Sequence, residues 1–193
     1  IGSKTTAAVE HMRSTKTSYF NLSRELVTMG SNPLNPVLKT YEVSTDCFEI
    51  AERAIKKQQT ALFANFTWPT QPNAQQDLDQ ARQEMNDLFV LALWAAFERF
   101  VITYLQNKGA ILQRLEPNAL AMSVYDYFKV EVEYWKPDEI LELIKGIPSI
   151  NKHVIGQART ILRYRNWVAH GKNVQKKPPV KAMAPTYTHQ ILE

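Results

Sequence analysis

The chain has 193 residues, of which 45% are hydrophobic and 22% charged, with a formal net charge of +4 and a single cysteine, Cys47. This length suits one domain with a self-sufficient core, and one cysteine excludes an intrachain disulfide and a cysteine-based metal site. The mild basic excess permits nucleic acid as a partner without arguing for it. Because no charge-free apolar run reaches the roughly 18 residues of a membrane span and no secretory signal is visible, we expect a cytoplasmic protein without contact to a membrane.

Glycine is scarce and alternating β-type runs are absent, so the sequence predicts an all-α fold, a bundle of about five to six helices. Residues 5–29 predict a first helix that ends at Gly30. Asn-Pro pairs at 32–33 and 35–36 then break the chain. We therefore assign 1–36 to an N-terminal helix and a proline-containing linker.

Apolar residues at helical spacing predict a second helix over 37–66 and a third over 74–108. From Leu88 to Leu105 the third helix is apolar on nearly every face, which is typical of the central helix of a bundle. The only charged residues in that stretch are Glu98 and Arg99.

Prolines near their first turns predict two further helices, over 117–134 and 138–145. Ser149 can cap the last core helix. We expect this helix to reach His170 and to end at Gly171, the residue type that most often terminates helices.

Lysines and prolines dominate the residues that follow, and they predict an extended or disordered basic tail over 173–193. The helical bundle proper is therefore assigned to 37–172. The lysines of the tail could follow an RNA backbone or could simply keep a disordered end soluble.

A polar stripe marks the last core helix. Two helical turns advance about 7.2 residues, so Arg163, Asn166 and His170 share one face, which Arg159 extends by one turn. Arg165 points about 140° away from His170 on an ideal helical wheel. A histidine in the last turn can simply favour the helix dipole, but a core-facing helix would not otherwise carry this stripe.

The run from Arg165 to Gly171 (RNWVAHG) closes an all-α domain and follows a central apolar helix that bears one glutamate, Glu98. In these features the sequence resembles the HEPN superfamily of small helical bundles, many of which are metal-independent endoribonucleases. The resemblance covers about residues 40–172.

The resemblance implies that Arg165 and His170 are the catalytic pair and that Asn166 belongs to the same site. Helix geometry keeps Arg163 as a second basic group near His170. Glu98 matches the acidic residue often found on the preceding helix, where it would orient the arginine. Two other readings of Glu98 stay open, an ion pair with a buried arginine, Arg165 or Arg99, and a solvated charge at a wet edge of the bundle.

Flanking residues are expected to contact RNA. Arg159 extends the basic stripe, Tyr164 could stack on a base, and Lys172 could bind the backbone. Trp167 could also stack, although packing against the bundle or a dimer partner suits it better. One subgroup of the superfamily pairs with an antitoxin and carries a tyrosine two residues after the histidine. This chain has Lys172 at that position, so we do not expect regulation by modification of such a tyrosine.

These residue types suit RNA cleavage by the ribose 2′-OH, because histidine moves protons near neutral pH and arginine stabilises charge on phosphoryl oxygens. We expect no metal and no cofactor. The resemblance further implies a homodimer that joins two motifs, RNA as the substrate (with tRNA as one candidate), and a toxin or anti-phage defence role with an antitoxin or defence partner. Two alternatives stay open: a non-catalytic HEPN-like module that binds RNA or protein, and a plain helical bundle built for oligomerisation.

Overall fold

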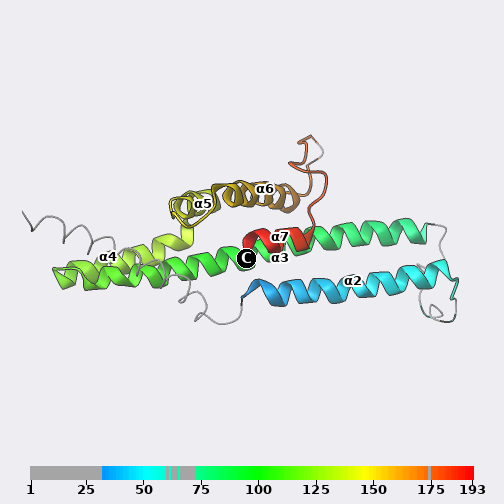
Figure 1. Ribbon diagram of the computed structural model, residues 1–193, viewed down its shortest axis with the longest axis horizontal. Helices are drawn as coiled ribbons and strands as arrows, with labels where there is room; N and C mark the ends of the chain where they lie inside the picture. Colours follow the sequence, from blue (N-terminus) through cyan, green and yellow to red (C-terminus); the bar gives the residue numbers. More distant parts are fainter. Residues whose placement is uncertain (1–31, 60, 62–64, 66–72, 174) are drawn as a thin grey trace, which may run out of the picture. The chain divides into compact units, whose positions relative to one another are not determined.

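The computed structural model describes residues 32–59, 61, 65, 73–173 and 175–193. The elements assigned within these ranges are helices alone, which confirms the all-α prediction and the expected number of helices (Figure 1). The six α-helices and two short 3₁₀ helices are α2 (Leu34–Lys56), α3 (Ala74–Gly109), η3 (Ala110–Arg114), α4 (Asn118–Glu131), η4 (Val132–Tyr134), α5 (Pro137–Lys145), α6 (Lys152–Ala169) and α7 (Pro185–Leu192). The helix predicted over 5–29 lies outside the described residues.

Helix α3 is the central element, as its apolar composition predicted, because it contacts α2, α4, α6 and α7. Its side chains Val90, Leu93 and Trp94 are buried in the main core together with residues of α6 and α7. At its C-terminal end Gly109 lies so close to the ring of Phe128 on α4 that a Cβ would overlap it. A glycine is therefore needed at this crossing.

Length and composition alone would also allow the helical stretch Ala74–Arg114 to cross a membrane. The most apolar part of this stretch, from Leu88 to Leu105, contains only two charged residues, Glu98 and Arg99. Two charges alone do not exclude a membrane span, so the lack of a charge-free run does not settle the question. Its contacts with four other helices are those of a central helix in a helical bundle. The cytoplasmic location stays a prediction.

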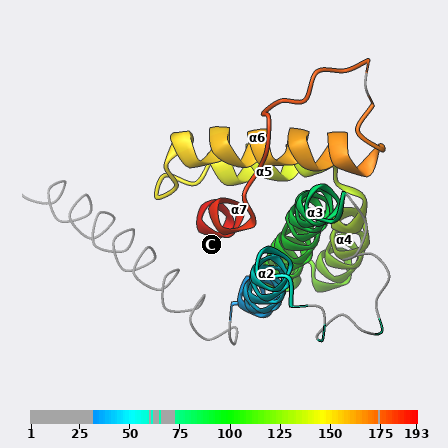
Figure 2. The ribbon, with the colours of Figure 1, turned by 90° about the vertical axis from the view of Figure 1, so that its right-hand side faces the viewer.

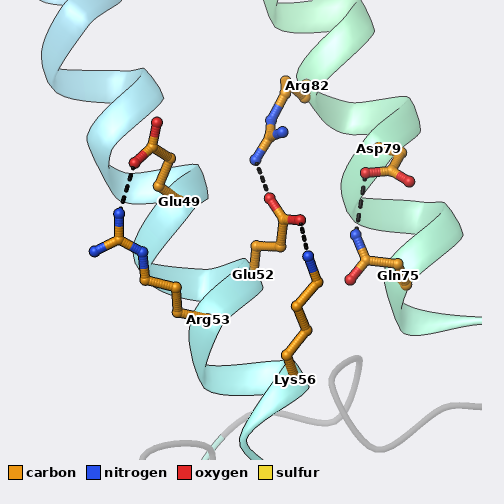
Figure 3. A network of polar contacts seen from close by, with 7 residues as sticks. All are labelled: Glu49, Glu52, Arg53, Lys56, Gln75, Asp79 and Arg82. Atoms are coloured by element: carbon orange, nitrogen blue, oxygen red, sulfur yellow. Dashed lines mark hydrogen bonds and ion pairs between the residues drawn. The ribbon is translucent and has the colours of Figure 1, made fainter.

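Helices α2 and α3 are joined by polar and aromatic contacts. Glu52 accepts hydrogen bonds from Lys56 on its own helix (2.6 Å) and from Arg82 on α3 (2.9 Å), as Figure 3 shows. Tyr41 and Phe89 meet edge to face, with their ring centroids 5.3 Å apart. Exposed ion pairs contribute less than about 1 kcal/mol each. Apolar contacts such as that of Tyr41 with Phe89 therefore stabilise the packing of α2 on α3 more than these ion pairs do.

The prediction of a second helix over 37–66 was wrong at both ends. Helix α2 begins at Leu34, so Asn35 and Pro36 lie in its first turn and do not break the chain. Helix α2 ends at Lys56, and Gln58 adopts a left-handed backbone with φ of +50°. The run from Lys56 to Gln59 is entirely polar, so continuing the helix would bury no apolar surface. Most of the predicted continuation lies outside the described residues.

A second core lies at the C-terminal end of α3. Val101 and Ile102 pack there against Val132 of η4 and Ile140 of α5. The predicted helices over 117–134 and 138–145 are confirmed as α4 with η4 and as α5. The last turn of the first predicted helix is the 3₁₀ helix η4. Eight large apolar side chains between 111 and 134 stay exposed: Ile111, Leu115, Leu120, Met122, Val124, Tyr127, Val130 and Tyr134.

Helix α6 begins two residues later than the cap at Ser149 predicted. The side chain of Asn151 accepts a hydrogen bond from the backbone N–H of His153 (2.9 Å) and so caps the helix. Asparagine and serine are both good N-caps. Ser149 lies within a turn in which the N–H of Ile150 donates to the carbonyl of Ile147 (3.0 Å), so the helix begins after this turn.

The prediction of an extended or disordered tail over 173–193 was wrong for its C-terminal part. Residues Pro185–Leu192 form α7, which packs on α2, α3 and α6 (Figure 2). Met183 and Leu192 belong to the main core, and Pro185 suits the first turn of a helix. Pro33–Glu193 form one unit, so the bundle extends past the predicted boundary at 172.

Candidate functional site

The end of α6 reverses the direction of the chain. Gly171 has a φ of +76°, and its N–H donates to the carbonyl of Val168 (2.9 Å). The N–H of Lys172 donates to the carbonyl of Trp167 (3.0 Å). These two bonds form a Schellman motif, which is a common helix terminus that requires a left-handed residue. The predicted end at Gly171 is confirmed, and the following loop runs back along the helix.

Hydrogen bonds hold this loop beside α6. The indole N–H of Trp167 donates to the carbonyl of Lys176 (3.2 Å). The side chain of Asn173 accepts from the N–H of Gln175 (2.9 Å), and the N–H of Lys176 donates to the carbonyl of Asn173 (3.0 Å). This is an asparagine-stabilised turn. The loop therefore has a defined course next to the helix.

A pocket of about 330 Å³ lies between the last turns of α6 and this loop. We call it the α6 pocket, and its lining residues are Arg163, Asn166, Trp167, His170, Asn173, Lys176, Lys177 and Pro179. Three of them are permanent cations and one is a histidine, and no carboxylate is among the eight described lining residues. Such a pocket attracts anions.

The helical wheel predicted that three of the lining residues share one face of α6, and it also placed there Arg159, which is not among the described lining residues. Arg163, Asn166 and His170 all line the pocket. Arg165, which the family resemblance made the primary arginine, is not among the lining residues and lies half-buried on the side of the helix. Its guanidinium donates to the side-chain oxygen of Asn166 (2.9 Å), so it reaches the pocket through that amide. With its oxygen engaged, Asn166 presents its NH₂ group as a donor.

The three flanking residues predicted to contact RNA all have partners within the fold. Tyr164 is only 1% exposed, and its ring packs against Trp167, with the two ring centroids 5.8 Å apart. Arg159 forms an ion pair with Glu142 of α5. Lys172 forms ion pairs with two carboxylates of α3. The burial of Tyr164 contradicts its predicted stacking on a base. The RNA contacts of Arg159 and Lys172 stay predictions, although each already has an acidic partner on a neighbouring helix, which a one-dimensional pattern does not reveal.

Asp87 is a buried acid that the sequence analysis did not single out. It is 2% exposed, and its two oxygens accept from the hydroxyl of Tyr164 (2.6 Å) and the ammonium of Lys172 (2.8 Å). Gln83 donates to it as well (3.1 Å), and Glu84 binds the same ammonium (2.7 Å). We call these five residues the Asp87 cluster.

Electrostatics in the cluster follow from burial and pairing. Burial and the hydrogen bond to Asp87 raise the pKa of Tyr164. Burial alone would lower the pKa of Lys172, but its contacts with Asp87 and Glu84 outweigh it, so the net shift is upward. Helical spacing could have revealed the acid, because Asp87 lies three and seven residues before the buried Val90 and Trp94.

Glu98 has a different partner from those predicted. Its carboxylate accepts from the indole N–H of Trp94 (3.0 Å), one turn earlier on α3. Arg99 instead makes two hydrogen bonds to Glu133 of η4 (2.8 and 2.7 Å). Among the described residues Glu98 pairs with neither Arg165 nor Arg99, so no contact supports a role in orienting Arg165.

Comparison of the chain with protein-family models, with curated proteins and with solved structures finds no match. Within the described part of the chain, no group of three or more histidine, cysteine or acidic side chains is arranged to hold a metal ion. Among the described residues, the α6 pocket is the feature that indicates the chemistry of the site.

Proposed function

We propose that this protein is a metal-independent endoribonuclease of the HEPN type, with the α6 pocket as half of its active site. One observation carries the proposal: the pocket gathers Arg163, Asn166 and His170 with two loop lysines, and its described lining residues include no carboxylate. A phosphodiester is the anion that uses all of these groups, because arginine and lysine bind phosphoryl oxygens and histidine transfers protons near neutral pH.

In the proposed reaction the ribose 2′-OH attacks the adjacent phosphorus and the bond to the 5′-oxygen breaks. His170 takes the proton of the 2′-OH, and Arg163 stabilises the charge on the phosphoryl oxygens. Asn166 donates its NH₂ group to one of those oxygens, and Arg165 orients it. The products carry a 2′,3′-cyclic phosphate and a 5′-hydroxyl.

The leaving 5′-oxygen needs a proton as well, and the described lining of one pocket includes one histidine. A homodimer that brings two α6 pockets to one phosphate would supply it, with one His170 as the base and the other as the acid. RNA, with tRNA as a candidate, is the proposed substrate. A toxin or antiviral defence role in the cytoplasm, with an antitoxin or defence-system partner, rests on the family resemblance.

Cleavage of RNA in the presence of a chelator tests the proposal. We expect the wild type to cut RNA and to leave DNA of the same sequence intact, because DNA lacks the 2′-OH. His170→Ala should lose about 10²- to 10⁴-fold in rate with unchanged thermal stability. His153→Ala is the matched control, since His153 is an exposed histidine at the other end of the same helix.

Wild-type protein that leaves every RNA intact would sink the nuclease proposal. The alternative is a non-catalytic module that binds RNA through the same cations, and the presence of one histidine among the described lining residues favours it. It predicts RNA binding that survives His170→Ala and weakens in Arg163→Ala. The partner would in that case be held without being cut.

A further inference from the structure

Lys172 connects the α6 pocket to the core of the protein. It lies two residues after His170 and directly before Asn173, and both of these neighbours line the pocket. Its own side chain points away to Glu84 and Asp87 on α3. The backbone at one edge of the pocket is thus attached to the central helix by an ion pair.

The conformation of Lys172 requires such an attachment. After Gly171 it is the second consecutive left-handed residue, with a φ of +53°. A residue with a Cβ pays about 1 kcal/mol or more for this conformation, so the surrounding contacts must maintain it. Its N–H bond to the carbonyl of Trp167 and its ion pairs to α3 are those contacts.

The ion pair fixes the course of the loop because both ends of the contact are held. Asp87 is bound by Tyr164 of α6 and by Gln83 of its own helix, so its carboxylate has one orientation. The backbone that follows Lys172 brings Asn173, Lys176 and Lys177 to the pocket. Moving Lys172 would move these three residues relative to Arg163 and His170.

We infer that Asp87 and Lys172 are positioning residues that set the distance between the loop lysines and the α6 cations, and so tune the pocket for the phosphates of a single-stranded RNA. Neither residue lines the pocket. That the pocket is tuned for RNA rests on the proposed function. That Asp87 and Lys172 hold the loop in place does not depend on it.

The substitution Asp87→Asn distinguishes positioning from simple electrostatics, because the two predict opposite changes in RNA affinity. It removes a negative charge, so the net charge rises from +4 to +5, and electrostatics alone would strengthen RNA binding. Positioning predicts the reverse. We expect the Kd for a fluorescein-labelled single-stranded RNA, measured by anisotropy, to rise roughly tenfold.

The loop is observed directly by hydrogen exchange. The amides of Lys172 and Lys176 donate to the carbonyls of Trp167 and Asn173, and we expect Asp87→Asn to speed their exchange roughly tenfold. Glu133→Gln is the matched control, because it breaks an ion pair between α3 and η4 that does not line the pocket. Because it makes the same change in net charge as Asp87→Asn, it should leave the exchange of the loop amides unchanged and should not raise the Kd.

Two further variants keep the test decisive. Lys172→Arg retains both ion pairs and should stay within about twofold of the wild type in Kd. Glu84→Gln weakens the same attachment but leaves Asp87 in place, so it replaces Asp87→Asn if that protein does not fold. It should shift both measurements in the same direction by a smaller factor.

Unchanged exchange of the loop amides in both variants would overturn the inference. Faster exchange with unchanged or tighter RNA binding would also count against it, since the cluster would then stabilise the loop without tuning the pocket. If the wild type binds no RNA, the proposed function fails, and the exchange result alone decides whether Asp87 and Lys172 position the loop.

Discussion

The α6 pocket and the Asp87 cluster lie at the same end of one helix, and their residues alternate along it. Arg163 and His170 line the pocket, whereas Tyr164 and Lys172 belong to the cluster. The pocket has three permanent cations and no carboxylate among its described lining residues, while the cluster has two carboxylates for one cation. This difference separates two roles. The ammonium of Lys172 is paired with carboxylates and serves the structure, whereas the cations of the pocket have no carboxylate among the described lining residues and are available for an anionic ligand.

The largest effect expected is on the rate of RNA cleavage. Arg163→Ala should reduce it about 10²- to 10³-fold, because the variant removes a cation that stabilises charge in the transition state. Arg165→Ala should reduce it about tenfold, because that arginine acts through Asn166. Single-turnover rates of the two variants give the comparison. A greater loss in Arg165→Ala would show that the family pattern, and not the pocket, identifies the main arginine.

The next effect is on stability. Lys172→Met leaves the carboxylate of Asp87 without its cation and should lower the free energy of unfolding by about 2 kcal/mol, less than for a fully buried pair because the lysine side chain is 27% exposed. Lys145→Met, which breaks the exposed pair with Glu142, should cost less than about 0.5 kcal/mol. Urea unfolding measures both. Equal effects would contradict the structural role of the cluster.

A smaller effect should appear at alkaline pH. Since the pKa of Tyr164 is raised in the folded state, the unfolded chain loses this proton first, above about pH 10. Unfolding then releases a proton, so stability falls as pH rises, by at most about 1.4 kcal/mol per pH unit. The raised pKa of Lys172 acts in the same direction.

Tyr164→Phe should remove this contribution of the tyrosine. We expect a loss of about 1 kcal/mol near pH 8, because the hydroxyl no longer donates to Asp87, and a shallower decline above about pH 10. Urea unfolding at a series of pH values measures both. Parallel curves for the variant and the wild type would show that Tyr164 does not carry the alkaline dependence.

The smallest effect concerns the loop lysines. Lys177→Ala should weaken RNA binding a few-fold and reduce the slope of log Kd against log salt concentration by about 0.7, the value for one contact to a single strand. Lys129→Ala, an exposed lysine on α4, should leave the slope unchanged. If both variants have the same effect, binding is spread over the basic surface and is not concentrated in the pocket.

Local periodicity predicted most of the helices. The span of α3 was correct to one residue because its apolar run is long, although Gly109 keeps a helical backbone (φ −61°) and the chain continues directly as η3. The same 3.6-residue period placed Arg163, Asn166 and His170 on one face, and all three line the pocket. Both results depend only on residues close together in sequence.

The errors came from contacts between distant residues. The hydroxyl of Tyr164 reaches Asp87, 77 positions earlier, and α7 is stabilised by packing on α2, α3 and α6. The lysines and prolines before α7 concealed it, since the core that buries Met183 and Leu192 exists only in the folded bundle. Which polar residues are neutralised likewise depends on partners that the sequence order does not reveal.

Helix α3 crosses two separate cores, one with α6 and α7 and one with η4 and α5. Few residues are shared between the two, with Phe97 and Ile144 packed against both. We therefore expect the protein to open in two steps, because contiguous cooperative units unfold at their own free energies. The smaller core, beside the exposed apolar side chains of α4, should open first and leave the half of α3 that carries Asp87 folded.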